Sequence, residues 1–396
     1  MIARDQANWR PPGPIGDNRF AMKNFSRRDV LRTVPAAAIA VAAPGGFAVT
    51  PRQRVFIGSN TPDGILAFDW DPATAELKKV EVAAKLANVD WIVYSRDRKH
   101  IYAASEVDSF NGKQTGAVAS YSVAAGKLSP ISAQNSAAKG TCYVGLDHTG
   151  QVLLSADYGG GATASFKITA GKLSAAVWTE HYQGHGPVTD RQEAAHAHFA
   201  SFSPDNRFAY INDLGSDCIH IYKLNAETAE LTGAGKWIAT PGSGPRTLHF
   251  HPNGVTAYCM NELASAVDVL HWNKADGSLK TITRVELNPD RSKPTSTGCD
   301  TVITKDGRFV YFANRGDDFI FAFHADGKTG ALSPIGKTPS GGTTPRNFAL
   351  DPTERWMLVA NQNSSNLAVF ARNPQTGALA AEFKSYECAS PMCILF

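Results

Sequence analysis

The sequence predicts an all-β protein, a seven-bladed β-propeller closed by its C-terminal strand. One unit of two short apolar strands, a turn and a third strand recurs seven times after residue 51. The copies begin about 46–56 residues apart, which is the spacing of propeller blades. No stretch after residue 50 carries a convincing helical period, so helices are not expected in this part.

The seven copies share alternating strands and turn residues. They occupy residues 55–77, 101–128, 153–173, 209–231, 257–279, 310–332 and 357–379. Strands such as Ile-Leu-Ala-Phe at 65–68 are about five residues long, and pairs such as Asn253-Gly254 and Asp306-Gly307 mark the hairpins. Gly159, Gly160 and Gly161 are interpreted as one such hairpin turn rather than as a nucleotide-binding loop. Because one unit cannot cover its own apolar faces, neighbouring sheets must stack into a ring.

The two ends of the array indicate how the ring closes. Every copy except the first is preceded by another strand that ends in a turn of the Pro-Asp-Gly kind. The first copy has no such strand, whereas residues 391–396, Pro-Met-Cys-Ile-Leu-Phe, follow the seventh copy as a spare strand. We therefore expect residues 391–396 to complete the first blade. The alternative is a free C-terminal tail.

The N-terminus has the pattern of a targeting segment. Arg27 and Arg28 precede a short stretch rich in Ala and Val, as in a twin-arginine export signal. Pro35 and Pro44 interrupt this stretch, which is too short to span a membrane. We expect a leader at 1–50, a propeller domain at 51–396 and a periplasmic or secreted protein. The alternative is a chance arginine pair in a disordered tail.

Composition narrows the classes of partner. Charged residues are 19% of the chain and the net charge is +3, without a dense Lys/Arg block, so nucleic acid is not an expected partner. The six cysteines form no Cys-x-x-Cys pair and no zinc-finger spacing, so neither a metal nor a cofactor is expected. Cys388 and Cys393 are either a short disulfide loop or two small buried residues.

Registering the copies on their turns aligns two sets of polar positions, which a propeller would arrange as rings around its axis. The first ring contains Asp90, Cys142, His198, Arg246, Cys299 and Arg346. The second contains Asn60, Glu106, Tyr158, Leu214, Glu262, Arg315 and Gln362. Polar groups at strand positions need partners or water. The rings therefore indicate either a wet channel with self-satisfied charges or a ligand site at its mouth.

Consecutive blades contribute His198, Arg246, Glu262 and Arg315 to these rings. An acid, a candidate base and two fixed cations suit an anionic substrate or an oxyanion. An exposed and unpaired Arg246 would support the interpretation as a ligand site. A buried carboxylate that neutralises Arg246 would instead favour a structural role.

Several longer segments carry a family resemblance. They are Gly-His-Gly-Pro-Val-Thr-Asp-Arg-Gln-Glu-Ala-Ala-His-Ala-His at 184–198, Gly-Pro-Arg-Thr-Leu-His-Phe-His-Pro-Asn-Gly at 244–254, Asn-Glu-Leu at 261–263, Asn-Arg-Gly-Asp at 314–317 and Thr-Pro-Arg-Asn-Phe-Ala-Leu at 344–350. Over residues 53–396 the chain resembles the lactonase family of seven-bladed propellers. That family includes bacterial 6-phosphogluconolactonases of the propeller type and fungal enzymes that interconvert carboxymuconate and its lactone.

The resemblance implies a metal-free hydrolase of a sugar lactone, similar to a 6-phosphogluconolactonase, with gluconolactone as a candidate substrate in the periplasm. It implies catalytic roles for His198, Arg246, Glu262 and Arg315. It places Arg191 and His196 at the rim of the substrate pocket, and we assign Arg346 of the first ring to substrate binding as well.

Lactone hydrolysis needs a base that activates water and a group that stabilises the oxyanion. We expect Arg246 and Arg315 to bind the oxyanion or a substrate anion. His198 is the preferred base because its ordinary pKa lies near neutrality. Glu262, beside two arginines, is expected to stay ionised and to orient groups. The alternative function is an exported propeller that binds a sugar acid or a protein partner at the channel mouth without turnover.

Overall fold

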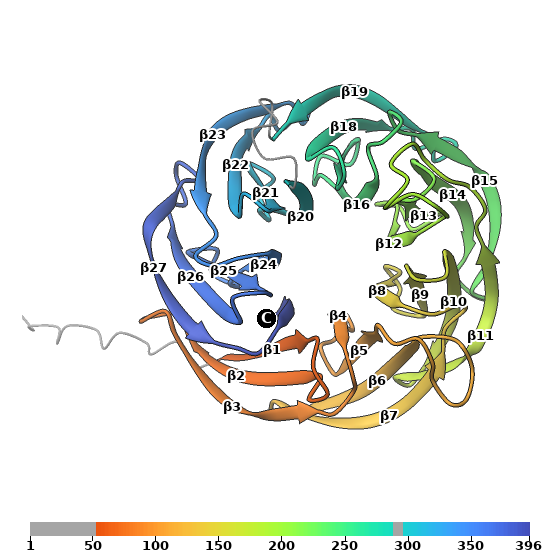
Figure 1. Ribbon diagram of the computed structural model, residues 1–396, viewed down its shortest axis with the longest axis horizontal. Coiled ribbons are helices and arrows are strands. Elements are labelled where there is room, and N and C mark those ends of the chain that lie inside the picture. Colours follow the sequence, from red (N-terminus) through yellow and green to blue (C-terminus); the bar gives the residue numbers. More distant parts are fainter. Residues whose placement is uncertain (1–52, 288–295) are drawn as a thin grey trace, which may run out of the picture. The chain divides into compact units, whose positions relative to one another are not determined.

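The computed structural model describes residues 53–287 and 296–396 (Figure 1). They form 28 strands in seven four-stranded antiparallel sheets, arranged as a ring. None of these residues is helical, as the sequence predicts, and accordingly they include no helix long and apolar enough to cross a membrane. The predicted leader, 1–50, lies outside the described residues.

The blades follow one another along the chain, each with four strands. Blade 1 contains β28 (Pro391–Leu395), β1 (Gln53–Ser59), β2 (Ile65–Asp71) and β3 (Glu76–Ala84). Blade 2 contains β4 (Val89–Tyr94), β5 (His100–Ser105), β6 (Ala117–Ala124) and β7 (Lys127–Asn135). Blade 3 contains β8 (Thr141–Leu146), β9 (Val152–Asp157), β10 (Ala162–Thr169) and β11 (Lys172–His181). Blade 4 contains β12 (Ala197–Phe202), β13 (Phe208–Asp213), β14 (Cys218–Asn225) and β15 (Glu230–Ile238).

The remaining three blades repeat the same order, innermost strand first. Blade 5 contains β16 (Pro245–Phe250), β17 (Thr256–Asn261), β18 (Ala266–Trp272) and β19 (Leu279–Glu286). Blade 6 contains β20 (Thr297–Ile303), β21 (Phe309–Arg315), β22 (Phe319–Ala325) and β23 (Leu332–Pro339). Blade 7 contains β24 (Pro345–Leu350), β25 (Trp356–Asn361), β26 (Asn366–Arg372) and β27 (Leu379–Glu387).

The C-terminal strand closes the ring, as the spare strand in the sequence predicts. Strand β28 pairs antiparallel with β1, with Phe56 opposite Leu395 and Ile57 opposite Ile394. In Figure 1 the C-terminus accordingly lies beside β1. Closure covers strand edges that would otherwise be exposed, and it places the first and last strands of the domain in one sheet.

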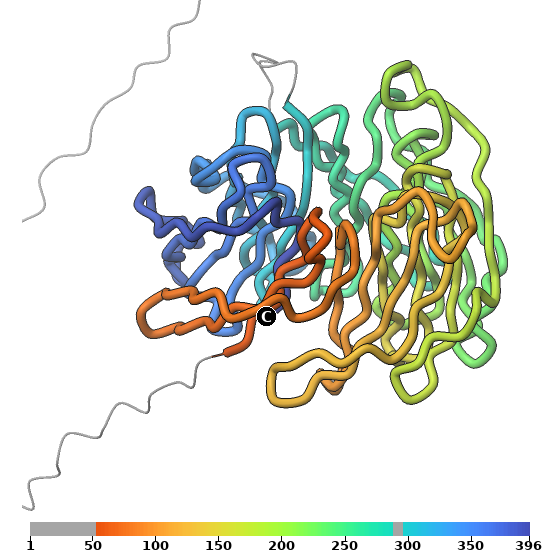
Figure 2. The backbone as a smooth tube through the Cα atoms, turned by 60° about the horizontal axis from the view of Figure 1, so that its bottom comes forward, coloured from red at the N-terminus to blue at the C-terminus, as the bar shows by residue number. Residues whose placement is uncertain are grey.

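Seven hydrophobic clusters, one at each interface between neighbouring blades, hold the ring together. Successive side chains of a strand point to opposite faces of its sheet. In β1, Ile57 therefore packs against blade 7 while Phe56 packs against blade 2. The tube view shows the neighbouring sheets of blades 2 and 3, in orange to yellow-green, standing side by side (Figure 2).

The structure also shows the glycines at 159–161 and the pair Cys388 and Cys393. The three glycines at 159–161 do form the turn between β9 and β10, and Gly161 has a φ of +57°, a conformation that glycine adopts at little cost. Cys388 and Cys393 are both free and buried, so the structure has two small buried residues rather than the disulfide loop.

Candidate functional site

The first ring of polar residues arises from a β-bulge in the innermost strand of every blade. In blade 4, Ala197 pairs with Asp213 and Phe199 with Asn212, so His198 between them is left without a partner. A bulge bends the strand and re-aims the extra side chain. The same shift leaves unpaired residues in all seven blades, and they include Asp90, Cys142, His198, Arg246, Cys299, Arg346 and Met392.

These seven side chains surround a small void on the axis. It measures about 20 Å³, which is room for about one water molecule and not for a sugar. The aromatic residues Trp91, Tyr143, Phe199 and His249 form a chain of ring contacts across four blades, with centroids 4.1–5.0 Å apart. Tyr143 and Phe199 line both the void and a separate hollow of about 440 Å³, so they separate the two. A ligand the size of a sugar must therefore bind outside the void.

Glu262 is the centre of the candidate site. It directly follows β17, and its carboxylate is buried, with 1% of the side chain exposed. Oε2 lies 2.6 Å from Nη1 of Arg246 and 2.8 Å from Nη2 of Arg315, while Oε1 lies 2.5 Å from Nη2 of Arg191. Burial would raise the pKa of Glu262, but Arg315, Arg246 and the other nearby cations hold it well below its usual range. Glu262 is therefore ionised near neutral pH.

Arg246 is not the exposed, unpaired residue that would support a ligand site. Its side chain is buried, its Nε donates a hydrogen bond to the carbonyl of Cys299 at 2.7 Å, and Nη1 binds Glu262. Taken alone, this pairing with a buried carboxylate favours a structural role for Arg246. The cluster is nevertheless not neutral, because Arg191 and Arg315 bind the same carboxylate. Three guanidinium groups share one negative charge.

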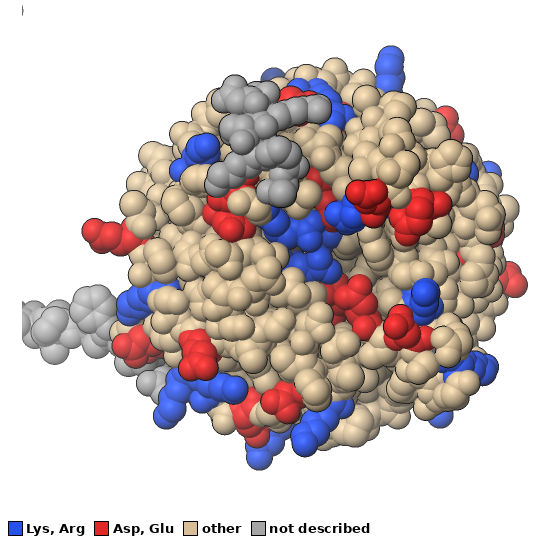
Figure 3. All heavy atoms as spheres, in the orientation of Figure 1, with Lys and Arg blue, Asp and Glu red and all other residues tan. Residues whose placement is uncertain are grey.

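Part of this positive charge is accessible. The side chain of Arg191 is 39% exposed and that of Arg315 is 15% exposed. Nε of Arg315 is buried and has no hydrogen-bond partner in the described part of the chain. Figure 3 shows basic side chains gathered over the middle of the ring with acidic side chains beside them. The cluster thus presents excess positive charge to an anion through the exposed parts of Arg191 and Arg315.

Arg191 reaches the cluster from the loop between β11 and β12. Its backbone N–H donates to the carbonyl of Val188, which forms a tight turn. The adjacent Gln192 is buried, and its side chain donates to the carbonyl of Leu214 at 2.9 Å. This anchor fixes the loop to the end of β13 and directs Arg191 toward Glu262 in the next blade.

His196 and Tyr158 support the same loop. His196 is buried, and its two ring nitrogens lie 2.9 Å from the carbonyl of Tyr158 and 3.2 Å from Oε1 of Glu193. Its ring stacks on Tyr158 at 4.4 Å, and the Tyr158 hydroxyl accepts a hydrogen bond from Arg191 at 3.3 Å. The structure thus places His196 behind the rim, where it holds the loop rather than presenting a free ring nitrogen.

His198 lies in the cluster as a neutral ring. Burial and the charge of Arg246 lower its pKa well below the usual range. Its Nε2 is hydrogen-bonded to Nη1 of Arg246, so the lone pair that would accept a proton is engaged. This geometry favours His198 as the residue that orients Arg246, and it disfavours the expected role as general base.

Arg346 forms a separate pair. Its Nη2 lies 3.0 Å from Oδ2 of Asp90, which is contributed by blade 2, so Arg346 binds this acid and not Glu262. Glu106 lies near this pair, and burial together with Asp90 raises its pKa to about 7. Tyr158, Glu106 and Asp90 belong to the two rings that the sequence predicts, but they are not among the predicted site residues.

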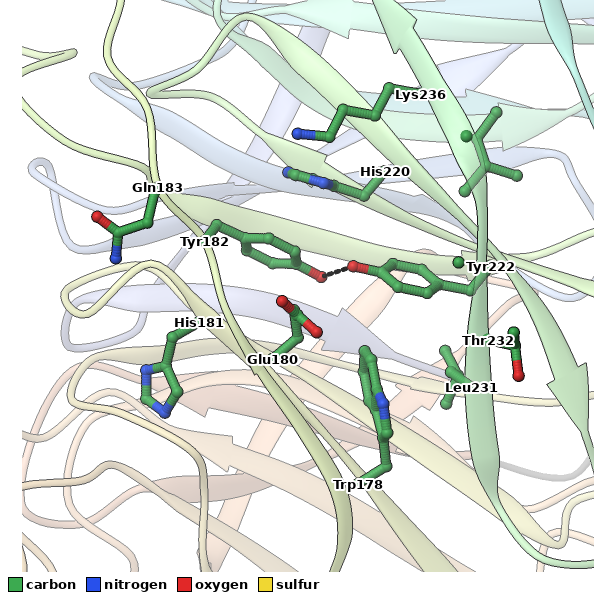
Figure 4. A pocket seen from close by; sticks show the side chains of 13 residues that line it. Trp178, Glu180, His181, Tyr182, Gln183, His220, Tyr222, Leu231, Thr232 and Lys236 are labelled. Carbon is green, nitrogen blue, oxygen red and sulfur yellow. Dashed lines mark hydrogen bonds between the residues drawn. The ribbon is translucent and has the colours of Figure 1, made fainter.

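A second hollow lies on the outside of the ring, between β11 of blade 3 and strands β14 and β15 of blade 4 (Figure 4). It measures about 750 Å³ and is lined by Trp178, Tyr182, His220 and Tyr222 among others. The Tyr222 hydroxyl donates to that of Tyr182 at 3.1 Å, as the dashed line in Figure 4 marks. None of the residues that the sequence assigns to the site lines this hollow.

Three residues of metal-binding type, Asp213, Cys218 and His220, lie together beside this hollow. Nε2 of His220 is 3.3 Å from Oδ2 of Asp213 and 3.5 Å from Sγ of Cys218, so the set could hold a divalent cation. The corresponding place in blade 5 is taken by Asn261, which donates to Asp268 at 2.8 Å. A polar bridge between these strands thus recurs in two blades, which gives the set a structural explanation.

Comparisons with known proteins agree with this architecture. Residues 54–396 match the family described as Lactonase, 7-bladed beta-propeller. The chain is 32% identical to the 6-phosphogluconolactonase of Bacillus subtilis over 86% of this chain and 97% of the relative. It is 33% identical to that of Formosa agariphila over 82% and 94%. The solved structure of the periplasmic gluconolactonase of Pseudomonas aeruginosa is similar, with a TM-score of 0.82 and 30% identity over 87% of this chain and 99% of that one.

Proposed function

Because the chain belongs to the family of seven-bladed β-propeller lactonases, we propose that it hydrolyses the ester bond of a sugar lactone at the cluster around Glu262. The observation that carries this proposal is the convergence of Arg191, Arg246 and Arg315 on one buried carboxylate. Excess positive charge in a partly buried site stabilises negative charge that develops in a transition state. Hydrolysis of an ester develops that charge on the carbonyl oxygen.

Each member of the cluster has a role in this proposal. Arg246 and Arg315 bind the carbonyl oxygen as it becomes an oxyanion. Glu262 stays ionised and holds the guanidinium groups in position, and His198 orients Arg246 from its other side. Arg191, on its loop over the mouth, binds the far end of the substrate and also the carboxylate of the product.

The substrate proposed is an aldonolactone, with gluconolactone as the first candidate. The names of the relatives support this class, since two are 6-phosphogluconolactonases and one similar structure is a periplasmic gluconolactonase. We also propose that residues 1–50 direct export through the twin-arginine route, which would place the enzyme where unphosphorylated gluconolactone is the accessible form.

A pH-stat assay with purified protein tests the proposal. Gluconolactone, its 6-phosphate and a simple lactone without hydroxyl groups would be compared after subtraction of spontaneous hydrolysis. We expect turnover of the sugar lactones and little turnover of the simple lactone. Spontaneous rates with all three substrates would contradict the proposal.

The burial of Arg246 against Glu262 favours one second candidate, a propeller that binds a sugar acid without turnover. Such a protein would bind gluconate in calorimetry and leave the hydrolysis rate of gluconolactone unchanged. The two measurements together distinguish an enzyme from a binding protein.

A further inference from the structure

Glu106 and Glu262 occupy equivalent places in blades 2 and 5. Each directly follows the second strand of its blade, since β5 ends at Ser105 and β17 ends at Asn261. Each backbone N–H donates at 2.8 Å to a carbonyl just before the innermost strand, Asn88 for Glu106 and Gly244 for Glu262. Blades 2 and 5, which carry the two acids, lie on nearly opposite sides of the ring (Figure 1).

The surroundings of the two acids differ. Both carboxylate oxygens of Glu262 are bound by arginines. The carboxylate of Glu106 forms no hydrogen bond or ion pair within 53–287 and 296–396, and the residue is only partly buried. One acid is therefore saturated, whereas the other is available to a water molecule or a ligand.

Charged and titratable groups face Glu106 from several elements. They are Asp90 on β4, Asp108 on the following loop, Cys142 on β8, Arg246 on β16 and Arg346 on β24. Burial is the largest cause and Asp90 the next, and together they raise the pKa of Glu106 to about 7 against the opposing effect of the arginines. Glu106 thus changes charge near neutral pH, while Glu262 stays ionised.

On the basis of the proposed lactone hydrolysis, we propose that Glu106 is the general base that activates the attacking water. Two carboxyl groups whose environments separate their pKa values are a common arrangement for dividing acid–base and electrostatic roles. The other candidates are engaged or buried. The accepting nitrogen of His198 binds Arg246, and the thiol of Cys142 is fully buried with a pKa raised well above its usual range.

Glu106 alone can carry out both proton transfers that the hydrolysis needs. Its carboxylate accepts a proton from water as the oxygen of that water forms a bond to the lactone carbonyl carbon. The carbonyl electrons move to the oxygen, which the arginines stabilise. When this intermediate collapses, the ring C–O bond breaks and the leaving oxygen takes the proton from Glu106. The product is a hydroxy acid, and its carboxyl proton is released to solvent.

Kinetics of Glu106→Gln over pH 5–9 test this assignment, with gluconolactone as substrate. Loss of a general base costs about 10²–10⁴ in rate, so we expect kcat to fall by this factor with little change in KM. The wild-type rate should rise with pH through a midpoint near 7, and this rise should be absent from the pH profile of the variant. Formate should partly restore the rate of Glu106→Ala by supplying the missing carboxylate.

Asp108→Asn is the matched control, since Asp108 is an exposed acid two residues away on the same loop. It should keep the wild-type kcat and move the midpoint slightly downward, because a like charge near Glu106 is removed. If wild-type protein hydrolyses the lactone and Glu106→Gln keeps both kcat and its rise with pH, the base assignment alone is wrong. If wild-type protein hydrolyses no lactone in the panel, the proposed function fails and the assignment falls with it.

Discussion

Arg191 and Glu262 lie 2.5 Å apart through Nη2 and Oε1, although one comes from the loop that joins blades 3 and 4 and the other from blade 5. The contact completes a set of three arginines around one carboxylate. Arg191 is the most exposed of the three, with 39% of its side chain accessible. It is therefore the member best placed to exchange its contact with Glu262 for one with a substrate.

Arg191→Ala should weaken substrate binding without unfolding the protein. A hydrogen bond to a charged group is worth about 1.5–3 kcal/mol, so KM for an anionic lactone should rise about tenfold or more. Asp190→Ala, next to it on the same loop, should leave KM unchanged. Steady-state kinetics and a thermal melt check both points, and equal effects of the two variants would mean that the loop and not the guanidinium matters.

His198→Gln should make the protein less sensitive to unfolding at low pH. The rise of kcat with pH near 7 should be unchanged in this variant. The pKa of His198 is lowered well below 6.5 in the folded state, so below pH 6.5 the unfolded chain binds a proton that the folded chain does not. Stability is thereby lost as pH falls. The variant should show a smaller difference in unfolding free energy between pH 7.5 and pH 5, measured with urea. His271→Gln, at an exposed position, is the control. If His198→Gln loses the rise of kcat with pH near 7, His198 is the general base after all.

Deletion of residues 391–396 should open the ring. The deletion removes the ladder between β28 and β1 and the buried residues Met392 and Ile394. We expect a large drop in melting temperature or association through the exposed edge of β1, detected by size-exclusion chromatography. A chain that lacks only Phe396, which lies beyond β28 and packs edge-to-face on Trp70, should lose less stability and keep the wild-type assembly. A monomeric and stable deletion variant would contradict ring closure as the source of stability.

Replacement of Arg27 and Arg28 by lysine should block export if the leader works as proposed. A fusion of the full chain to a reporter protein, fractionated into cytoplasm and periplasm, measures this. Lys23→Arg, which keeps the charge outside the arginine pair, should leave export intact. Periplasmic protein from the double variant would refute the twin-arginine assignment.

The sequence predicts the ring and its closure because both depend on patterns local to the chain. Alternating strands, turn residues and one spare strand at 391–396 are enough to count seven blades and to pair the ends. The same registration finds both polar rings, and the structure gives the reason, since residues such as His198 and Arg246 fall at the same bulge in each blade.

The chemistry of the individual side chains could not be predicted in the same way. Arg246 carries the same charge whether it is exposed or bound to Glu262, and only the packing decides between them. The usual pKa of His198 predicts a base, whereas burial and Arg246 lower that pKa and Arg246 engages the accepting nitrogen. Glu106 shows the opposite effect, because desolvation and Asp90 bring an ordinary acid to a pKa of about 7.

The rate of gluconolactone hydrolysis by Arg246→Ala and Glu262→Ala, measured by pH-stat beside wild-type protein, tests the central claim most directly. Loss of a group that stabilises an oxyanion costs about 10²–10³ in kcat, and Arg246→Ala removes such a group. Glu262→Ala releases the guanidinium groups that the carboxylate positions, so both variants should fall by at least this factor while remaining folded by circular dichroism. Folded variants that keep wild-type activity would contradict the claim that the arginine cluster around Glu262 is the active site.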